Sequence, residues 1–202
     1  MKFNLDIEKL KLAMKKAGHN LFENDSKNYN LNLIGVRETS PIFDSFNDLM
    51  IVAWKYKGNW TLKEYKTTTL AGLHWMKNPM NPQGCAILKE GRYSATWQIG
   101  LHNGKYKALV QRKPVQVYRD NDKDSVYDFD VPIDKGFFGI NIHRASAFNI
   151  LDKVGKNSAG CQVLQDPKDF KEFMALVTKS EKIWGNSFTY TLISENYFYD
   201  KD

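Results

Sequence analysis

Residues 49–68 have the sequence LMIVAWKYKGNWTLKEYKTT, in which two stretches rich in β-branched and aromatic residues flank the tripeptide Lys57-Gly58-Asn59. β-Branched and aromatic side chains favour pleated strands, and glycine beside asparagine favours a tight turn. The segment therefore predicts two strands, Leu49 to Tyr56 and Trp60 to Thr68, with a turn between them.

The same pattern recurs along most of the chain. Further strands are predicted at Leu31 to Arg37, Tyr93 to Ile99, Ala108 to Tyr118, Gly136 to His143 and Phe188 to Ser194. Short strands at this spacing, separated by Gly, Pro and Asn turns, are typical of a sandwich or barrel. We therefore expect a mainly β fold.

Two segments have helical spacing instead. After Asp6, apolar residues recur with the period of a short amphipathic helix, and Gly18 supplies its end. A second helix is predicted to begin at Asp166-Pro167, where Asp166 can cap the first turn and proline suits its first position. The expected organisation is an N-terminal helical segment, residues 1–25, followed by one domain, residues 26–202.

Composition excludes several classes of protein. The 202 residues are 42% apolar and 26% charged, as in ordinary folded chains. The net charge of +6 comes mostly from lysine, which does not favour a dedicated nucleic-acid binder. No apolar run approaches the ~18 residues of a spanning helix, so no membrane insertion is expected. Asp6 and Glu8 interrupt the region where a secretory signal needs apolar residues, which predicts synthesis in the cytoplasm.

Cys161 and His143 could form a nucleophile and its base. Alternation along the predicted strand Gly136 to His143 directs His143 away from the apolar side. Ser158, Ala159 and Gly160 are small residues that let the backbone approach closely just before Cys161. An imidazole can remove the thiol proton, and the backbone N–H groups of Gly160 and Cys161 could stabilise an oxyanion. The alternative is that Cys161 is buried and chemically silent.

The run Ser158-Ala159-Gly160-Cys161, preceded by His143-Arg144 and followed by a helix at Asp166-Pro167, resembles the active-site signature of L,D-transpeptidase (YkuD-like) catalytic domains. The motif-level resemblance covers Gly136 to about Ser180. The preceding region resembles the family only in being rich in predicted β-strands. It implies an L,D-transpeptidase-like β-sandwich or barrel with one helix after the nucleophile strand.

The resemblance also implies residue roles. Cys161 corresponds to the nucleophile, His143 to the general base, Gly160 to the oxyanion-hole glycine and Ser158 to the hydroxyl residue that opens the second half of the motif. The family's second histidine falls at Ala159, and its polar residue after the cysteine falls at Val163. Arg144, directly after the base, could bind a substrate carboxylate.

Members of this family act on peptidoglycan stem peptides through a thioacyl-enzyme and need no cofactor. The resemblance therefore implies hydrolysis or transpeptidation of stem peptides, with His143 lowering the pKa of the Cys161 thiol. Variants with Ser-Ala-Gly-Cys resemble those of phages and prophages, which implies delivery to the wall after phage-type release or as part of a virion. The loss of polar groups at Ala159 and Val163 predicts hydrolysis over cross-linking. The competing hypothesis is a catalytically silent structural or wall-binding component of a phage particle, in contact with virion proteins.

Three weaker signals remain. Asp120, Asp122 and Asp124 alternate as carboxylates do in a Ca²⁺ loop, but Ser125 and Val131 stand where such a loop needs glycine and a bidentate glutamate, which favours an acidic surface turn. His102 lies in a predicted hairpin turn, where solvent exposure is the simplest expectation, and it could replace the missing second histidine only if that turn folds over the site. His74, Tyr93 and Trp97 could line a substrate groove, but aromatic residues on strands more often pack in the core.

Overall fold

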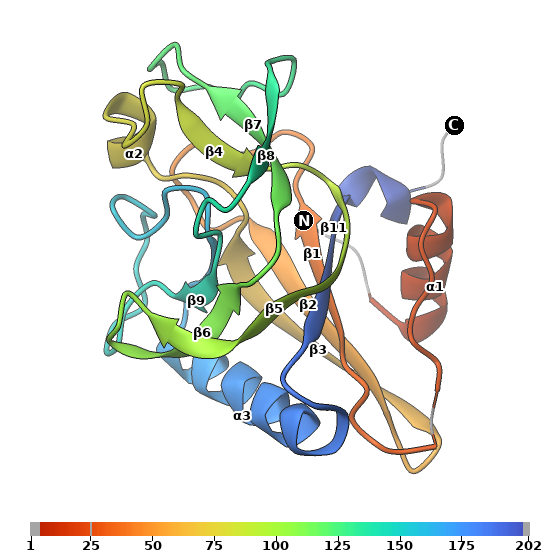
Figure 1. Ribbon diagram of the computed structural model, residues 1–202. Helices are drawn as coiled ribbons and strands as arrows, with labels where there is room; N and C mark the ends of the chain where they lie inside the picture. Colours follow the sequence, from red (N-terminus) through yellow and green to blue (C-terminus); the bar gives the residue numbers. More distant parts are fainter. Residues whose placement is uncertain (1–4, 25, 200–202) are drawn as a thin grey trace.

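The chain folds around a closed eight-stranded barrel. The computed structural model describes residues 5–24 and 26–199. Around the barrel the strand order is β1-β11-β5-β6-β9-β10-β3-β2, and β4, β7 and β8 form a separate small sheet above it (Figure 1). The barrel strands are β1 (Asn32–Arg37), β2 (Asp48–Tyr56), β3 (Asn59–Thr68), β5 (Gly91–His102), β6 (Tyr106–Gln111), β9 (Ile142–Arg144), β10 (Gln162–Leu164) and β11 (Phe188–Ser194).

This architecture confirms the expected mainly β fold class. Strands β1, β2, β3, β5 and β11 lie where the sequence predicts strands, and the turn at Lys57-Gly58-Asn59 joins β2 to β3. The single strand expected from Ala108 to Tyr118 is instead two strands, β6 and β7 (Val115–Asp120). Pro114 lies between them, and a proline has no N–H to donate to a strand ladder.

The strand predicted from Gly136 to His143 is wrong over most of its length. Only Ile142 and His143 belong to a barrel strand, while Gly136 ends β8 (Ile133–Gly136). The side chain of Gln111 replaces the ladder between them: its Oε1 accepts from the N–H groups of Phe138 at 3.1 Å and Ile140 at 3.0 Å. Gly139, at φ +69°, then turns the backbone in a way that an L-residue resists.

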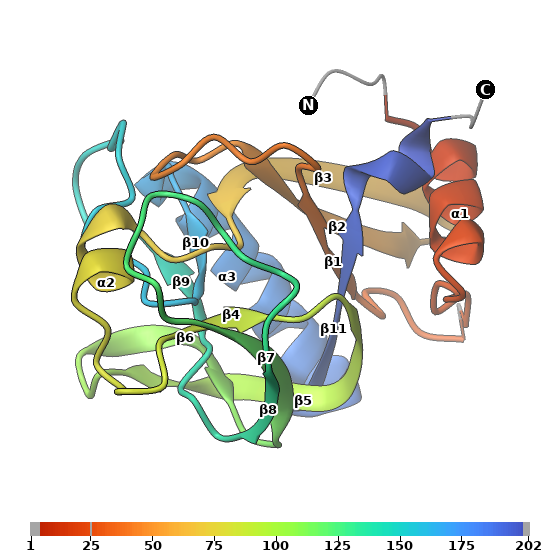
Figure 2. The same ribbon diagram turned by 90° about the horizontal axis from the view of Figure 1, so that it is seen from above.

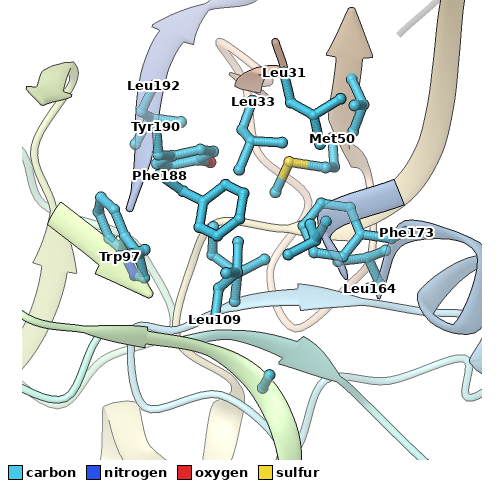
Figure 3. Close-up of a cluster of buried hydrophobic side chains, with 14 of the residues drawn as sticks. Leu31, Leu33, Met50, Trp97, Leu109, Leu164, Phe173, Phe188, Tyr190 and Leu192 are labelled. Atoms are coloured by element: carbon cyan, nitrogen blue, oxygen red, sulfur yellow. The ribbon is translucent and has the colours of Figure 1, made fainter. Parts of the chain in front are cut away.

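The main core fills the barrel and extends to its covering elements. Figure 3 shows Trp97, Phe188 and Tyr190 gathered with Leu109 and several aliphatic side chains from the surrounding strands. The rings of Trp97 and Tyr190 meet edge to face, with centroids 5.4 Å apart. Tyr93 also meets Trp97 edge to face, so these aromatic residues pack together and Trp97 does not line a groove.

Helix α3 (Pro167–Trp184) follows β10 and packs against this core through Phe170, Phe173 and Val177. The Asp166 carboxylate accepts from the Lys168 N–H at 2.7 Å, and Pro167 occupies the first turn, so the predicted start of the helix is confirmed. The same helix therefore fixes the short strand β10 from its C-terminal side.

Helix α1 (Ile7–Lys16) lies on the outside of the barrel, far from β9 in both views (Figures 1 and 2). Asp6 caps it, and Gly18 follows its end at φ +78°, as the sequence predicts. Its buried face shares a second apolar cluster with residues of β1, β2 and β11. No described helix combines the length and the apolar character required to cross a bilayer.

Four elements were not predicted from the sequence: α2 (Leu73–Lys77), β4 (Cys85–Leu88), β8 and the 3-10 helix η1 (Glu195–Phe198). β4 pairs with β7, and β7 pairs with β8. In both views α2 lies on the side of the molecule away from α1 (Figures 1 and 2). The small sheet and α2 therefore frame the region where the predicted catalytic residues lie.

Candidate active site

Cys161 and His143 come from neighbouring parallel strands. In the register of β9 with β10, His143 is opposite Val163, and the Gln162 N–H donates to the Asn141 carbonyl at 2.9 Å. Cys161 therefore stands directly before β10, beside the start of β9. Both residues line one cleft of about 500 Å³.

The turn before the thiol depends on glycine and serine. Gly160 has φ +118°, and a Cβ at this position would collide with the Ala86 carbonyl oxygen of β4. Ser158 is buried; its Oγ accepts from the Gly160 N–H at 3.2 Å and donates to the Cys161 carbonyl at 2.9 Å. In this structure Ser158 and Gly160 thus shape the turn that presents Cys161.

His143 is buried rather than presented, with only 3% of its surface exposed, contrary to the expectation from alternation. Its Nδ1 lies 2.9 Å from the Arg144 carbonyl oxygen. A carbonyl only accepts, so Nδ1 carries the proton and Nε2 keeps its lone pair. Nε2 is buried and has no hydrogen-bond partner among the described residues.

Burial sets the protonation state of His143. It lowers the pKa of the imidazole to about 3, with a further lowering from His102 that the bond to the Arg144 carbonyl partly opposes. The ring is therefore neutral at pH 7. A neutral imidazole with a free Nε2 has the protonation state of a general base.

Burial also controls Cys161. Its pKa is raised to about 11, although the Asn141 N–H, 3.4 Å from Sγ, favours the thiolate. The thiol donates to the Gly139 carbonyl at 3.4 Å. The expectation that this thiol has a lowered pKa is therefore wrong for the protein as described, and the resting pair is a neutral thiol with a neutral imidazole.

His102, at the end of β5, lies against the candidate base. The imidazole rings of His102 and His143 stack with centroids 4.0 Å apart and planes at 20°. Asn141 orients His102: its Oδ1 accepts from the Gln111 N–H, so its amide nitrogen faces His102 Nδ1 at 3.0 Å. The hairpin turn after β5 does fold over the site, and His102 is half-buried there rather than fully exposed to solvent.

Tyr106 was missed from the sequence. Its hydroxyl lies 3.3 Å from His143 Nδ1 and donates to the Arg144 carbonyl at 3.4 Å. The Tyr106 hydroxyl therefore contacts both partners of the hydrogen bond between His143 Nδ1 and the Arg144 carbonyl. The Arg144 guanidinium lies over the Tyr106 ring, 4.1 Å from its centroid. Tyr106 begins β6, directly after the hairpin turn that follows His102, but no spacing rule in the sequence links it to His143.

The cleft is cationic. Lys105, Arg144 and Lys156 line it, and no carboxylate does so among the described residues. Trp75, Met80 and Phe138 supply apolar surface, and Ala159 lines the cleft where the resembling family has histidine. Val163 is fully buried in a small apolar cluster that Cys161 contacts, so it packs beneath the thiol and does not line the cleft. Such a lining favours an anionic ligand.

The other candidates lie elsewhere. Cys85 is buried, burial raises its pKa to about 12, and its thiol donates to the Trp75 carbonyl at 3.2 Å. His74 packs edge to face on Trp75. In the acidic turn, carboxylate oxygens of Asp120, Asp122 and Asp128 lie within 4.8 Å of one another, so Asp128 takes the place expected for Asp124.

No family model, curated protein or solved structure matches this chain.

Proposed function

We propose that the protein is a cysteine-dependent peptidoglycan stem-peptide hydrolase of the L,D-transpeptidase-like kind, acting as an L,D-carboxypeptidase or endopeptidase. One observation carries the proposal: Cys161 and His143, a neutral and oriented imidazole whose Nε2 has no hydrogen-bond partner among the described residues, line the same cationic cleft. The cleft's surplus of lysine and arginine suits stem peptides, which carry free carboxylates.

The chemistry follows from these protonation states. The raised pKa of Cys161 keeps the thiol protonated at rest, so proton transfer accompanies attack. His143 Nε2 takes the thiol proton as Sγ bonds to the scissile carbonyl carbon, and the imidazolium then protonates the departing amine. Water cleaves the resulting thioester with His143 again as base. Since the Gly160 N–H is engaged by Ser158, the Cys161 N–H is the expected oxyanion donor.

Arg144 has two proposed roles in this mechanism. Its backbone carbonyl orients His143, and its guanidinium, held on the Tyr106 ring at the cleft wall, binds a stem-peptide carboxylate. Arg144→Lys keeps the carbonyl and changes only the side chain. We expect it to weaken turnover of stems with a free carboxylate more than of amidated stems; an equal loss on both would exclude the side-chain role.

A second function has its own supporting observation. Burial raises the thiol pKa and lowers the imidazole pKa, and both shifts disfavour a thiolate. That combination favours a catalytically silent protein, as a structural or wall-binding component of a phage particle would be.

The deciding experiment is the intact mass of the protein after incubation with a muropeptide or a carbapenem. Hydrolase function predicts an acyl adduct that Cys161→Ala abolishes and Cys85→Ala retains. Purified tetrapeptide stems with a large excess of a D-amino acid should then yield the shortened tripeptide. Accumulation of exchanged stems would make the protein a transpeptidase. The absence of both adduct and product would favour the silent function.

A further inference from the structure

The acidic turn between β7 and β8 has the geometry of a cation site. Asp120 ends β7, and one oxygen from each carboxyl of Asp120, Asp122 and Asp128 lies within 4.8 Å of the other two. Ca²⁺ binds oxygen at 2.3 to 2.6 Å, so two of its ligands can be at most about 5 Å apart. A single ion can therefore contact all three carboxylates.

An unsatisfied buried atom supports this site independently of the clustering. Asp120 is 2% exposed, and its Oδ2 accepts from the Asp128 N–H at 3.0 Å. Its Oδ1 is buried and has no hydrogen-bond partner among the described residues. Buried carboxylate oxygens nearly always have a partner, because leaving one unpaired costs the full desolvation penalty.

Asp122 and Asp128 place their carboxyl groups beside that of Asp120, so like charges repel one another within the turn. Arg119 precedes Asp120, but its guanidinium donates to Asp134 and to the Gly84 carbonyl. A bound cation would relieve this repulsion and give the buried Asp120 carboxylate a further partner.

We propose that Asp120, Asp122 and Asp128 bind one Ca²⁺ ion that fixes the turn between β7 and β8. Carboxylate oxygens are hard ligands, which disfavours Zn²⁺ in a site without nitrogen or sulfur. An irregular loop suits the variable geometry of Ca²⁺ better than the strict octahedron of Mg²⁺.

The turn is connected to the segment before the nucleophile. Tyr127, buried in the same turn, donates its hydroxyl to the Ala71 carbonyl at 2.7 Å and accepts from the Asp44 N–H at 3.2 Å. Asp44 Oδ1 in turn accepts from the Gly155 N–H at 2.7 Å. Fixing the turn therefore fixes Tyr127 and, through Asp44, the chain that leads to Cys161. The site itself does not depend on the proposed hydrolase activity.

The test is calorimetric titration of the full, chelator-treated chain with CaCl₂, using Asp122→Asn and Asp130→Asn. Asp122 is exposed, and asparagine can still accept from the Asp124 N–H, so the variant keeps its turn. Asp130→Asn is the matched control, because it removes the same charge from an exposed position outside the cluster. We expect Asp122→Asn to weaken binding by about tenfold or more, and Asp130→Asn by less than about twofold.

A second readout is proteolysis of the turn at residues 121–126, which Ca²⁺ should slow in the unsubstituted protein and in Asp130→Asn but not in Asp122→Asn. Absence of binding by the unsubstituted protein at ~10 mM CaCl₂, a concentration above the range of known protein sites, would overturn the proposal. Equal weakening by both variants would also overturn it, since only the net charge would then matter. Tighter binding of MgCl₂ or ZnCl₂ would overturn the assignment to calcium.

Discussion

Two adjoining regions of the barrel, a regular side around β2 and β3 and an irregular side around β9 and β10, are built differently. On one side β2 and β3 pair continuously from Asp48 opposite Thr67 to Tyr56 opposite Asn59. On the other side β9 and β10 have three residues each, and β6 is joined to β9 through the single pair Leu109 and Ile142. Backbone hydrogen bonds hold the first side, whereas side chains such as Gln111 and Trp97 hold much of the second.

The region with the regular ladder is therefore distinct from the region that holds the candidate site. A long regular ladder leaves few backbone groups free to face a ligand, while the short strands let the chain diverge around Cys161 and His143. The Trp97 indole of β5, fixed in the core, donates to the Ile140 carbonyl at 2.7 Å and so anchors the segment before β9 to the core. Substitutions on the regular side should therefore change mainly the free energy of unfolding, and substitutions on the irregular side should change mainly the reactivity of Cys161.

The largest effect is expected in how the alkylation rate of Cys161 depends on pH. Because its pKa is raised to about 11, the thiolate fraction should grow tenfold per pH unit, or about a thousandfold from pH 7 to pH 10. The second-order rate of iodoacetamide labelling, followed by mass spectrometry of the two cysteine peptides, measures this. Cys85 in the core should label more slowly throughout. A rate that levels off near pH 7 would mean that His143 does hold a thiolate.

The next largest effect concerns stability on the regular side. Met50 in β2 is fully buried in the main core, so Met50→Ala should lower the free energy of unfolding by about 2–5 kcal/mol. Cys161→Ala, at a half-buried position, should change it by less than about 1 kcal/mol. Urea denaturation of both variants tests the comparison. A Cys161→Ala variant as unstable as Met50→Ala would make the thiol a core residue.

The buried imidazole makes stability depend on pH. The pKa of His143 is about 3 in the folded chain and about 6.5 when unfolded, so the unfolded state binds the proton more readily. Stability from this group is complete above pH 6.5 and falls by up to about 1.4 kcal/mol per pH unit between pH 6 and pH 4. The free energy of unfolding of His143→Gln, measured over the same range, should fall less steeply. Parallel curves for the two proteins would contradict the burial of a neutral imidazole.

The smallest effect is expected from hydroxyl removal. Tyr106→Phe loses the contacts to His143 and the Arg144 carbonyl and should lower the free energy of unfolding by about 1 kcal/mol. Tyr56→Phe, at the exposed end of the regular side, should change it by less than about 0.5 kcal/mol. Thermal and urea unfolding give both values. If the two variants are equally stable, Tyr106 does not hold the base in place.

Sequence patterns predicted the regular side well because its strands and turns are determined by residues that are close together in the sequence. Alternation and turn residues located β2 and β3 within one residue, and the helix caps at Asp6 and Asp166 were readable from residue type alone. The irregular side depends on contacts between distant residues. Gln111 takes over the backbone of Phe138 and Ile140, which no local period reveals, and this is why the strand from Gly136 to His143 was mispredicted.

The candidate site divides in the same way. The Ser158-to-Cys161 run and the position of His143 could be found as a motif, and the structure brings both residues to one cleft. The stacking of His102 on His143 and the contact of Tyr106 with His143 could not be predicted from the sequence. His102 and Tyr106 lie in the β5–β6 hairpin, which meets His143 only once the barrel has folded. The burial that shifts both pKa values is likewise a property of the tertiary structure alone.

The pairing of β1 with β11 has a consequence for when the site forms during synthesis. The two strands pair in parallel from Leu33 opposite Tyr190 to Arg37 opposite Ser194, so the barrel closes only after residues 188–194 exist. Tyr190 then donates its hydroxyl to Gln162 Oε1 at 2.8 Å, while Gln162 Nε2 holds the Gly160 carbonyl at 3.3 Å. A nascent chain that already contains Cys161 and His143 thus lacks the strand that braces their turn. Completion of the cleft is therefore coupled to β11, a strand that is translated after both His143 and Cys161, and the turn before the thiol is braced only once residues 188–194 have been made.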